Sequence, residues 1–325
     1  MRALLWISVL LVGLWSGYWF VGKAAVDRAA VAFFETAPQQ GLHATHGGLS
    51  VVGYPSRFDL TVTDPVLRDL RSGASWQAPF VQILSLSYRP WHVIAAFAPR
   101  QSIGLPGQDL TLVSEKLQAS VVVTPNTALT LDRTTLVGTG LGLTSTAGWA
   151  LRTDELRFGT RADPSRSNTQ DIGLEILGLT PDPQLAALLP DLPQVAERLY
   201  VTGFVGFSAP FDRFAGQTRP TVTGVELKEA SLTWGPLAVV AKGDLAIDNG
   251  MPEGRIDIRV QGWRTMMPLI AATGVVKPEV VPTIERMLET LASQSGEAEM
   301  LDLPLIFTGG QMRLGPLPLG PAPRF

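Results

Sequence analysis

The stretch Gly254-Arg-Ile-Asp-Ile-Arg-Val260 decides the fold class, because apolar and charged residues alternate in it one by one. Successive side chains of a β-strand point to opposite faces, so Ile256, Ile258 and Val260 share one face and the charged residues share the other. The stretch therefore predicts a strand of an antiparallel sheet that has one covered face and one solvated face.

The same two-residue period recurs along the chain from Gly47 onward. It predicts further strands at Phe58–Val62, Leu84–Tyr88, Leu129–Leu131, Leu141–Leu143, Val225–Leu227, Leu232–Trp234, Leu237–Ala241, Leu245–Ile247 and Leu303–Phe307. Turn signals separate these runs, and the pair Asn249-Gly250 favours a tight hairpin. Gly-Pro-Leu follows a strand at 235–237 and again at 315–317, which we interpret as a recurrent strand-ending turn.

Helical spacing interrupts the strands in two places. A pair of short helices is predicted between Pro183 and Tyr200, and two more over 263–276 and 279–293. The last of these has an apolar face, formed by Val280, Ile284, Met287, Leu288 and Leu291. Such a face would cover part of the apolar side of the sheet.

An uncharged run of twenty residues, Ala3 to Gly22, precedes the strands. At about 1.5 Å per helical residue it spans roughly the 30 Å hydrocarbon core of a bilayer. Its aromatic side chains gather near its end and favour the level of the lipid headgroups. These interface residues are Trp15, Tyr18, Trp19 and Phe20. A signal peptide that is removed is the alternative, but its apolar stretch is normally shorter and a small-x-small cleavage site follows it.

These signals predict a mainly β fold, in which an N-terminal transmembrane helix precedes a large curved antiparallel sheet with a few covering helices. The expected segments are a signal anchor (1–22), its helical extension (23–40), a β-rich region (41–180), a helical connection (181–200) and a second β-rich region (201–325). The last region contains the helices at 263–293 and a Pro-rich C-terminal tail. No clean linker is visible, so a division near 180–200 and one continuous sheet across it are both open.

Composition restricts the function more than any motif does. Lys and Arg number 26 against 29 Asp and Glu, without an extended basic run, so a nucleic-acid partner is not expected. Cys is absent, which excludes thiolate metal sites and Cys nucleophiles. No cofactor is expected, because Gly138-Thr-Gly-Leu-Gly142 lacks the Lys of a phosphate-binding loop.

Individual catalytic candidates are weak as well. His43 and His46 have no obvious third metal ligand, and His92 has no evident orienting partner. Acidic pairs such as Asp154-Glu155 are ordinary at solvated strand and turn positions. The sequence therefore favours a protein that is not an enzyme, and a hydrolase with dispersed carboxylates ranks last.

Two segments carry a family resemblance. One is the early turn Gly53, Tyr54, Pro55, Arg57, Phe58 and Asp59. The other is spread over the later strands, at Trp234, Gly235, Pro236, Gly254, Gly310, Gly315 and Pro316. Together they resemble an uncharacterised bacterial family of inner-membrane-anchored envelope proteins, and more distantly the AsmA-like proteins.

The resemblance implies an envelope location and a β-rich, groove-forming fold in which AsmA-like proteins are thought to shield lipid. It supplies no catalytic residue. The expected function is thus that of a non-enzymatic periplasmic protein, anchored in the inner membrane through residues 3–22, which binds or shields lipid on an apolar sheet groove. The alternative is an envelope scaffold that binds another envelope protein through the sheet edge or the C-terminal tail.

Overall fold

A computed structural model describes residues 2–217, 219–268, 281–294 and 298–324. Its helices are α1 (Arg2–Thr36), η1 (Ala37–Gln40), α2 (Pro183–Ala187), η2 (Trp263–Met266) and α4 (Val281–Gln294). Its shorter, N-terminal strands are β1 (Leu42–Thr45), β2 (Gly48–Val52), β3 (Arg57–Thr63), β4 (Val66–Asp69), β5 (Ser75–Gln77), β6 (Phe80–Leu86), β7 (Arg89–Phe97), β8 (Arg100–Leu105), β9 (Gln108–Val113) and β10 (Lys116–Val123). The later strands are β11 (Leu131–Ser145), β12 (Ala150–Ala162), β13 (Thr169–Leu179), β14 (Ala196–Phe207), β15 (Val222–Trp234), β16 (Leu237–Asp248), β17 (Met251–Gln261), β18 (Met300–Thr308), β19 (Gln311–Leu314) and β20 (Leu317–Pro321).

The chain divides into two compact units. Unit 1 comprises residues 1–125 and 136–148, and unit 2 comprises residues 126–135 and 149–325. The predicted fold class is confirmed, because a long apolar N-terminal helix precedes large antiparallel sheets with few helices.

Unit 1 combines α1 with two runs of antiparallel pairings. One run is β2-β3-β6-β7-β10, and the other is β1-β4-β5-β8-β9-β11. The core of the first run is formed by Val51, Leu60, Val62 and Val81, and α1 covers it with Val26, Ala30 and Phe34. The helix thus buries apolar side chains of the sheet, at about 1.5–3 kcal/mol for each fully buried one.

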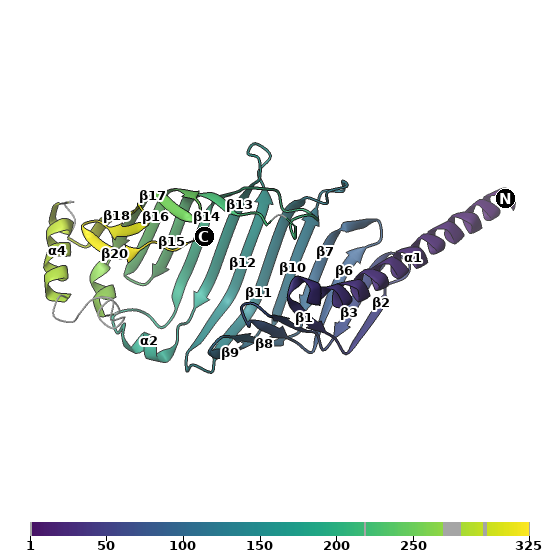
Figure 1. The fold of residues 1–325 in the computed structure, drawn as a ribbon. Coiled ribbons are helices and arrows are strands. Elements are labelled where there is room, and N and C mark those ends of the chain that lie inside the picture. The colour runs from purple at the N-terminus through teal and green to yellow at the C-terminus, as the bar shows by residue number, and fades with distance from the viewer. Residues whose placement is uncertain (1, 218, 269–280, 295–297, 325) are drawn as a thin grey trace. The chain divides into compact units, whose positions relative to one another are not determined.

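Unit 2 is an antiparallel meander, in which each strand from β12 to β19 pairs with the next strand along the chain, up to β20. Figure 1 shows its long strands side by side, with α4 next to the last strands of the meander. Hairpin chemistry explains the tight turns. Asn249 and Gly250 both have positive φ between Asp248 and Met251, as a type I′ turn requires.

The predicted Gly-Pro-Leu turns also join consecutive strands. In both copies the Gly has positive φ, at 56° for Gly235 and 54° for Gly315, directly after the last residue of a strand. Gly tolerates this conformation without a steric penalty, and the primed turns that it allows match the twist of the flanking strands.

Other details differ from the sequence expectation. Between residues 181 and 200 there is a single short helix, α2, and β14 already begins at Ala196, because Pro190 and Pro193 interrupt the helical spacing. β13 and β14 pair directly, so the sheet continues across this segment, which is one of the two alternatives that the sequence leaves open; the compact units have their boundaries near residues 125–149.

The structure also contains elements in the regions predicted near the C-terminus. The Pro-rich tail contains a strand, β20, paired with β19. The helix predicted over 279–293 appears as α4, and the one over 263–276 begins with η2. Residues 269–280 of these predictions, including Val280, lie outside the described residues.

Candidate functional site

The register of unit 2 places apolar side chains in continuous rows across its strands. One row runs through Phe158, Leu174, Val201, Ala230, Ala241, Ile258 and Leu303. The next runs through Leu156, Ile176, Leu199, Leu232, Val239, Val260 and Leu301. Residues paired in this way lie on the same side of a sheet, so the two rows define one surface, here called the apolar face.

Helices cover the C-terminal end of the apolar face. Leu288 and Ala292 of α4 and Trp263 of η2 pack with Val260 and Leu301 in a buried cluster. This is the covering role predicted for the helical segments. Of the predicted α4 face, Leu288 is buried and Leu291 packs against the same cluster.

The apolar face is only half-buried on β12 to β15. No member of the two rows is buried on these four strands, whereas Val260, Leu301 and Leu303 are buried at the α4 end. Bulky groups such as Phe158, Leu174 and Ile176 therefore retain contact with solvent. Contiguous apolar surface that stays in contact with solvent is one feature of the surfaces that bind ligands, partners or membranes.

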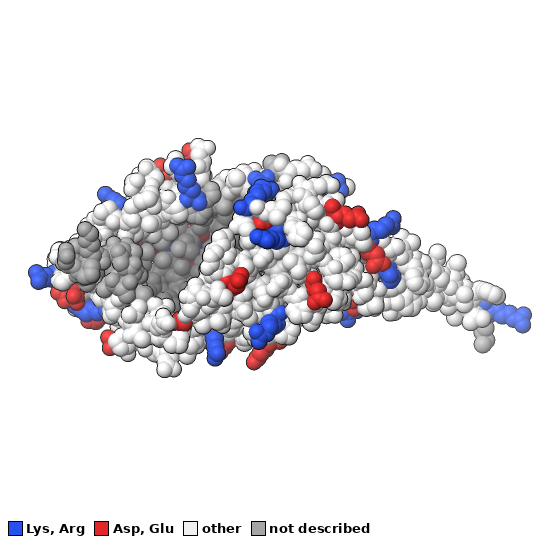
Figure 2. All heavy atoms as spheres, turned by 60° about the horizontal axis from the view of Figure 1, so that its bottom comes forward, with Lys and Arg blue, Asp and Glu red and all other residues white. Residues whose placement is uncertain are grey.

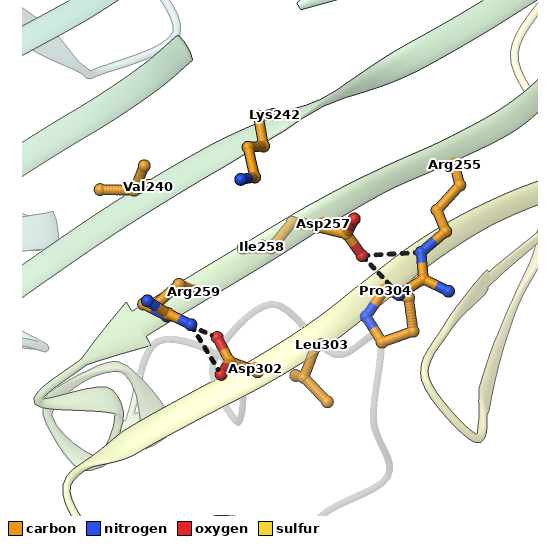
Figure 3. A pocket seen from close by; sticks show the side chains of 9 residues that line it. All are labelled: Val240, Lys242, Arg255, Asp257, Ile258, Arg259, Asp302, Leu303 and Pro304. Carbon is orange, nitrogen blue, oxygen red and sulfur yellow. Dashed lines mark hydrogen bonds and ion pairs between the residues drawn. The ribbon is translucent and has the colours of Figure 1, made fainter. Parts of the chain in front are cut away.

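The opposite face of unit 2 is polar. A hollow of about 490 Å³ lies over β16, β17 and β18, and Figure 3 shows the charged side chains that line it. Arg259 donates to both carboxylate oxygens of Asp302, at 2.7 and 3.1 Å, and Arg255 donates to Asp257 at 2.7 Å. The hydrogen bonds from Arg259 hold the pKa of Asp302 below its usual value.

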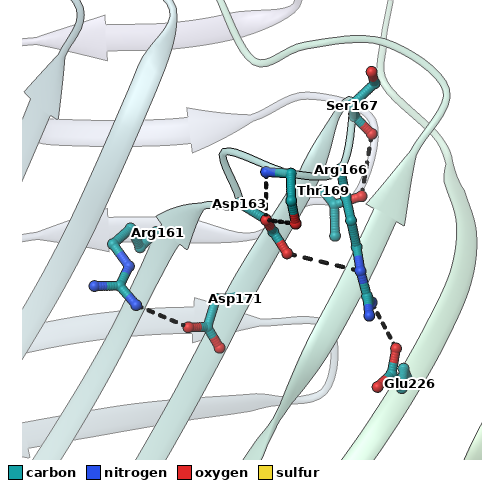
Figure 4. A network of polar contacts seen from close by, with 8 residues as sticks. Arg161, Asp163, Arg166, Ser167, Thr169, Asp171 and Glu226 are labelled. Atoms are coloured by element: carbon teal, nitrogen blue, oxygen red, sulfur yellow. Dashed lines mark hydrogen bonds and ion pairs between the residues drawn. The ribbon is translucent and has the colours of Figure 1, made fainter.

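A second polar network lies on β12, β13 and the turn that joins them (Figure 4). Arg161 donates to Asp171 at 3.2 Å, and Arg166 donates to Glu226 at 2.6 Å. The Ser165 hydroxyl and backbone N–H both donate to Asp163 and lower the pKa of its carboxyl group. Carboxylates held ionised in this way are poor general acids at neutral pH.

The first predicted motif forms the turn between β2 and β3. Gly53 has φ 111°, and a Cβ there would meet the Arg57 backbone oxygen at 2.8 Å, so only Gly fits without a shift. Tyr54 and Pro55 are joined by a cis peptide bond, Phe58 is buried, and Arg57 pairs with Asp59 at 3.1 Å.

The four aromatic residues predicted at the membrane interface lie against this same turn or beside it. Trp15 donates through Nε1 to the Pro55 oxygen at 2.9 Å, and Trp19 donates to the Arg57 oxygen at 2.8 Å. Tyr18 donates to the Ser87 oxygen. The Phe20 ring stacks on Tyr54, 6.1 Å between centroids.

The second motif is spread over the meander of unit 2. Trp234 donates to the Pro193 oxygen at 2.7 Å, and Gly235 donates its N–H to the Glu197 carboxylate at 3.0 and 3.2 Å. The remaining members hold turns or strand positions. Pro236 completes the β15–β16 turn, Gly254 pairs with Leu245 and Phe307, Gly310 lies in the β18–β19 turn, and Gly315 and Pro316 form the β19–β20 turn.

Two of the three histidines contact other side chains of the protein. The ring of His46 lies tilted against that of Phe34 with 4.4 Å between their centroids, and His92 shares a hydrogen bond of 2.9 Å with Ser120. Within the described residues no group of three His, Asp or Glu side chains is arranged to hold a metal ion.

Sequence reasoning missed the docking of α1 on the sheet of unit 1. The signal was present as a stripe at helical spacing. It consists of Trp15, Trp19, Gly22, Val26, Ala30 and Phe34. The position of Trp15 and Trp19 near the end of an uncharged run predicts the level of the lipid headgroups for both, whereas in the structure Trp19 packs on protein and is only 4% exposed.

Comparison with known families places the chain. A family model described as "Uncharacterized protein conserved in bacteria (DUF2125)" matches residues 19–323. The chain belongs to this family. The match covers all of the strands of this DUF2125 member and begins at Trp19 of α1. Comparisons with curated proteins and with solved structures found no match, and the resemblance to AsmA-like proteins stays a prediction.

One described helix of this DUF2125 member, Arg2–Gln40 with η1 included, is long and apolar enough to span a membrane. Length and composition alone fit a signal sequence as well as a membrane span.

Proposed function

We propose that this protein is a non-enzymatic component of the bacterial cell envelope, anchored in the inner membrane by α1, which binds lipid acyl chains on the apolar face of unit 2. The observation that carries the proposal is the half-buried part of that face on β12 to β15. Acyl chains match it because they are apolar and adapt to an extended surface without needing polar partners.

The contacts of α1 support an anchor that stays attached to the protein. Trp15, Tyr18 and Trp19 each donate a hydrogen bond to a backbone oxygen of unit 1, and Val26 and Phe34 pack on its core. Cleavage after the apolar run would remove these hydrogen bonds. We therefore assign the helix to the mature protein, with its N-terminus in the cytoplasm and the bulk in the periplasm.

The polar networks agree with a binding protein more than with an enzyme. The carboxylates of Asp163, Asp171 and Asp302 each accept hydrogen bonds, and Arg side chains pair with all three. A general acid at neutral pH needs a raised pKa, whereas the pKa values of Asp69, Asp163 and Asp302 are lowered.

Photocrosslinking tests the lipid-binding proposal. The full-length protein is reconstituted with phosphatidylethanolamine that carries a diazirine in its acyl chain, and crosslinked peptides are mapped by mass spectrometry. Crosslinks are expected on β12 to β15 in addition to α1. Crosslinks confined to α1 would overturn the proposal.

A matched pair of variants sharpens this experiment. Val201 and Thr202 are neighbours on β14 that point to opposite faces of the sheet. Val201→Lys places an ammonium group on the apolar face and should abolish crosslinking on β12 to β15, whereas Thr202→Lys should leave it unchanged. Val201→Thr, which keeps nearly the same volume but adds a hydroxyl, provides a milder change if the Lys variant fails to fold, and should reduce crosslinking.

The alternative, a scaffold that pairs through the sheet edge, receives less support. β20 has Pro318 and Pro321, which have no backbone N–H to donate to an added strand. Affinity capture of one specific envelope protein, lost on deletion of residues 315–325, would favour it instead.

A further inference from the structure

The part of α1 that projects beyond the rest of unit 1 is shorter than the hydrocarbon core of a bilayer is thick. Trp15 is the first residue of α1 with a hydrogen bond to the rest of unit 1, at the turn 53–56, and Ala3 to Leu14 before it are all exposed. Those twelve residues cover about 18 Å, whereas the hydrocarbon core is about 30 Å thick. The first charge after the run is Lys23, about 12 Å beyond Trp15 along the helix.

A bilayer that covers more of α1 than this free segment must therefore also reach the part of unit 1 beside Trp15 and Ser16, which then lies at the edge of the bilayer. Two turns lie at this level. The turn 53–56 accepts the hydrogen bond from Trp15 at Pro55, and Tyr54 shares one of 2.8 Å with Ser16. The turn 87–88 accepts the hydrogen bond from Tyr18 and is joined to the first by Ser87 N–H to the Ser56 oxygen, at 2.9 Å.

The chemistry of these two turns fits the membrane interface. Residues 53–56 and 87–88 carry no charge, and Tyr54 and Tyr88 are 52% and 54% exposed. Tyr rings favour the headgroup level, where one end is apolar and the other end is hydrated. Each turn is followed by an arginine, Arg57 or Arg89, which can extend to lipid phosphates.

Neighbouring apolar groups extend the same surface. Val52 precedes the first turn and is 57% exposed, and Phe20 and Val21 of α1 are 60% and 67% exposed. The loop beside the C-terminal end of α1, near Gln40, differs from these two turns because it contains the charged residues Asp69 and Arg71. The uncharged end of unit 1 thus coincides with the membrane end of its helix.

We propose that the turns 53–56 and 87–88 insert into the headgroup layer of the bilayer that α1 enters, so that unit 1 sits partly in the membrane rather than above it. The inference rests on the anchor proposed above and is independent of acyl-chain binding by unit 2. The two turns bind the lipid surface itself, and Tyr54 and Tyr88 place their rings beside α1 at the level of the headgroups.

The absence of Cys from the chain makes a depth measurement clean. Nitroxide labels are placed singly through Ser56→Cys and Tyr88→Cys in the full-length protein, in vesicles of phosphatidylethanolamine and phosphatidylglycerol. Leu10→Cys reports the anchor, and Ser72→Cys, in the charged loop, reports water. Collision rates with oxygen and with a water-soluble nickel chelate distinguish lipid, water and protein environments, because oxygen partitions into lipid.

We expect the collision rates of the label at position 10 to indicate lipid and those at position 72 to indicate water. The labels at positions 56 and 88 should lose collisions with the nickel chelate and keep collisions with oxygen. Water readings at 56 and 88 with a lipid reading at 10 would overturn the insertion and leave the anchor standing. A water reading at 10 would overturn both. Loss of both collision rates at 56 and 88 would indicate burial against protein and also overturn it. Two labelled positions keep the test decisive if one variant fails to fold.

Discussion

At the scale of single residues, Gly22 shows how one position can serve two environments. It is the last residue of the uncharged run, and α1 also passes close to β3 there, because a Cβ at Gly22 would overlap the Phe58 ring. A Cβ at Gly13 or at Gly17, by contrast, would meet no atom within 4 Å. The absence of a side chain at Gly22 thus sets the distance between helix and sheet.

We expect Gly22→Leu to destabilise unit 1, because the larger side chain must displace the buried Phe58. Overpacking of this kind costs about 1–3 kcal/mol. Thermal unfolding in detergent measures the change, and Gly17→Leu is the matched control with nothing within 4 Å. Equal unfolding temperatures for the two variants would show that α1 does not dock closely at Gly22.

The ion pair between Arg259 and Asp302 gives a pH-dependent prediction. Asp302 has a lowered pKa in the folded state, so its contribution is present above the unfolded pKa, near 3.8, and is lost as the pH falls through the lowered value. Both side chains are about half exposed, so the pair is worth only about 0.2–1 kcal/mol. Asp302→Asn should therefore lower the free energy of unfolding at pH 7 by that amount.

Urea unfolding of the wild type and of Asp302→Asn at pH 7 and pH 3 checks this. The difference between them should shrink at the lower pH, as Asp302 begins to protonate. Asp257→Asn, on the neighbouring strand, is a control for general loss of charge on this face. A difference that is unchanged or larger at pH 3 would contradict the assignment.

At the scale of elements, α1 is both a candidate membrane span and a helix that packs on the sheet of unit 1. Trp19 is the most buried residue of α1: it is 4% exposed, donates to the Arg57 oxygen, and packs on Tyr54 and Phe58. Trp6, earlier in the helix, is 71% exposed. The two Trp residues thus have the same chemistry in opposite surroundings.

Trp19→Ala should destabilise unit 1 by about 3–5 kcal/mol, the usual cost of deleting a buried aromatic side chain. Trp6→Ala should change the free energy of unfolding little in the same detergent. Limited proteolysis near residues 36–41 provides a second measurement, since an undocked helix exposes this connection. Equal protease resistance of both variants would argue against docking by Trp19.

The elements also show how far the sequence alone could lead. The alternation in Arg255–Val260 predicted its strand, and Asn249-Gly250 its hairpin, because strand periodicity and turn chemistry are local properties. Docking of α1 was missed because a Trp that packs on lipid and one that packs on protein have the same residue type and spacing. The apolar face was foreseen strand by strand, but its extent depends on register, which no single segment encodes.

At the scale of the whole molecule, the proposed topology requires both units on the periplasmic side of the inner membrane. Ser72 of unit 1 and Ser167 of unit 2 are both exposed, so a Cys at either position should be accessible. We expect Ser72→Cys and Ser167→Cys to react in intact cells with a maleimide that passes the outer membrane but not the inner one. Both sites lie well after Lys23, so translocation of the chain beyond α1 is what places them outside.

The control is a Cys added before Arg2, which should react only after the inner membrane is opened. If positions 72 and 167 also require that treatment, the orientation is reversed and the periplasmic assignment falls. Separate results for the two units would be informative as well. Because α1 is the one candidate span among the described residues, both units must report the same side. A label at 72 but not at 167 in intact cells would therefore contradict single-span anchoring itself, independently of any ligand on the apolar face.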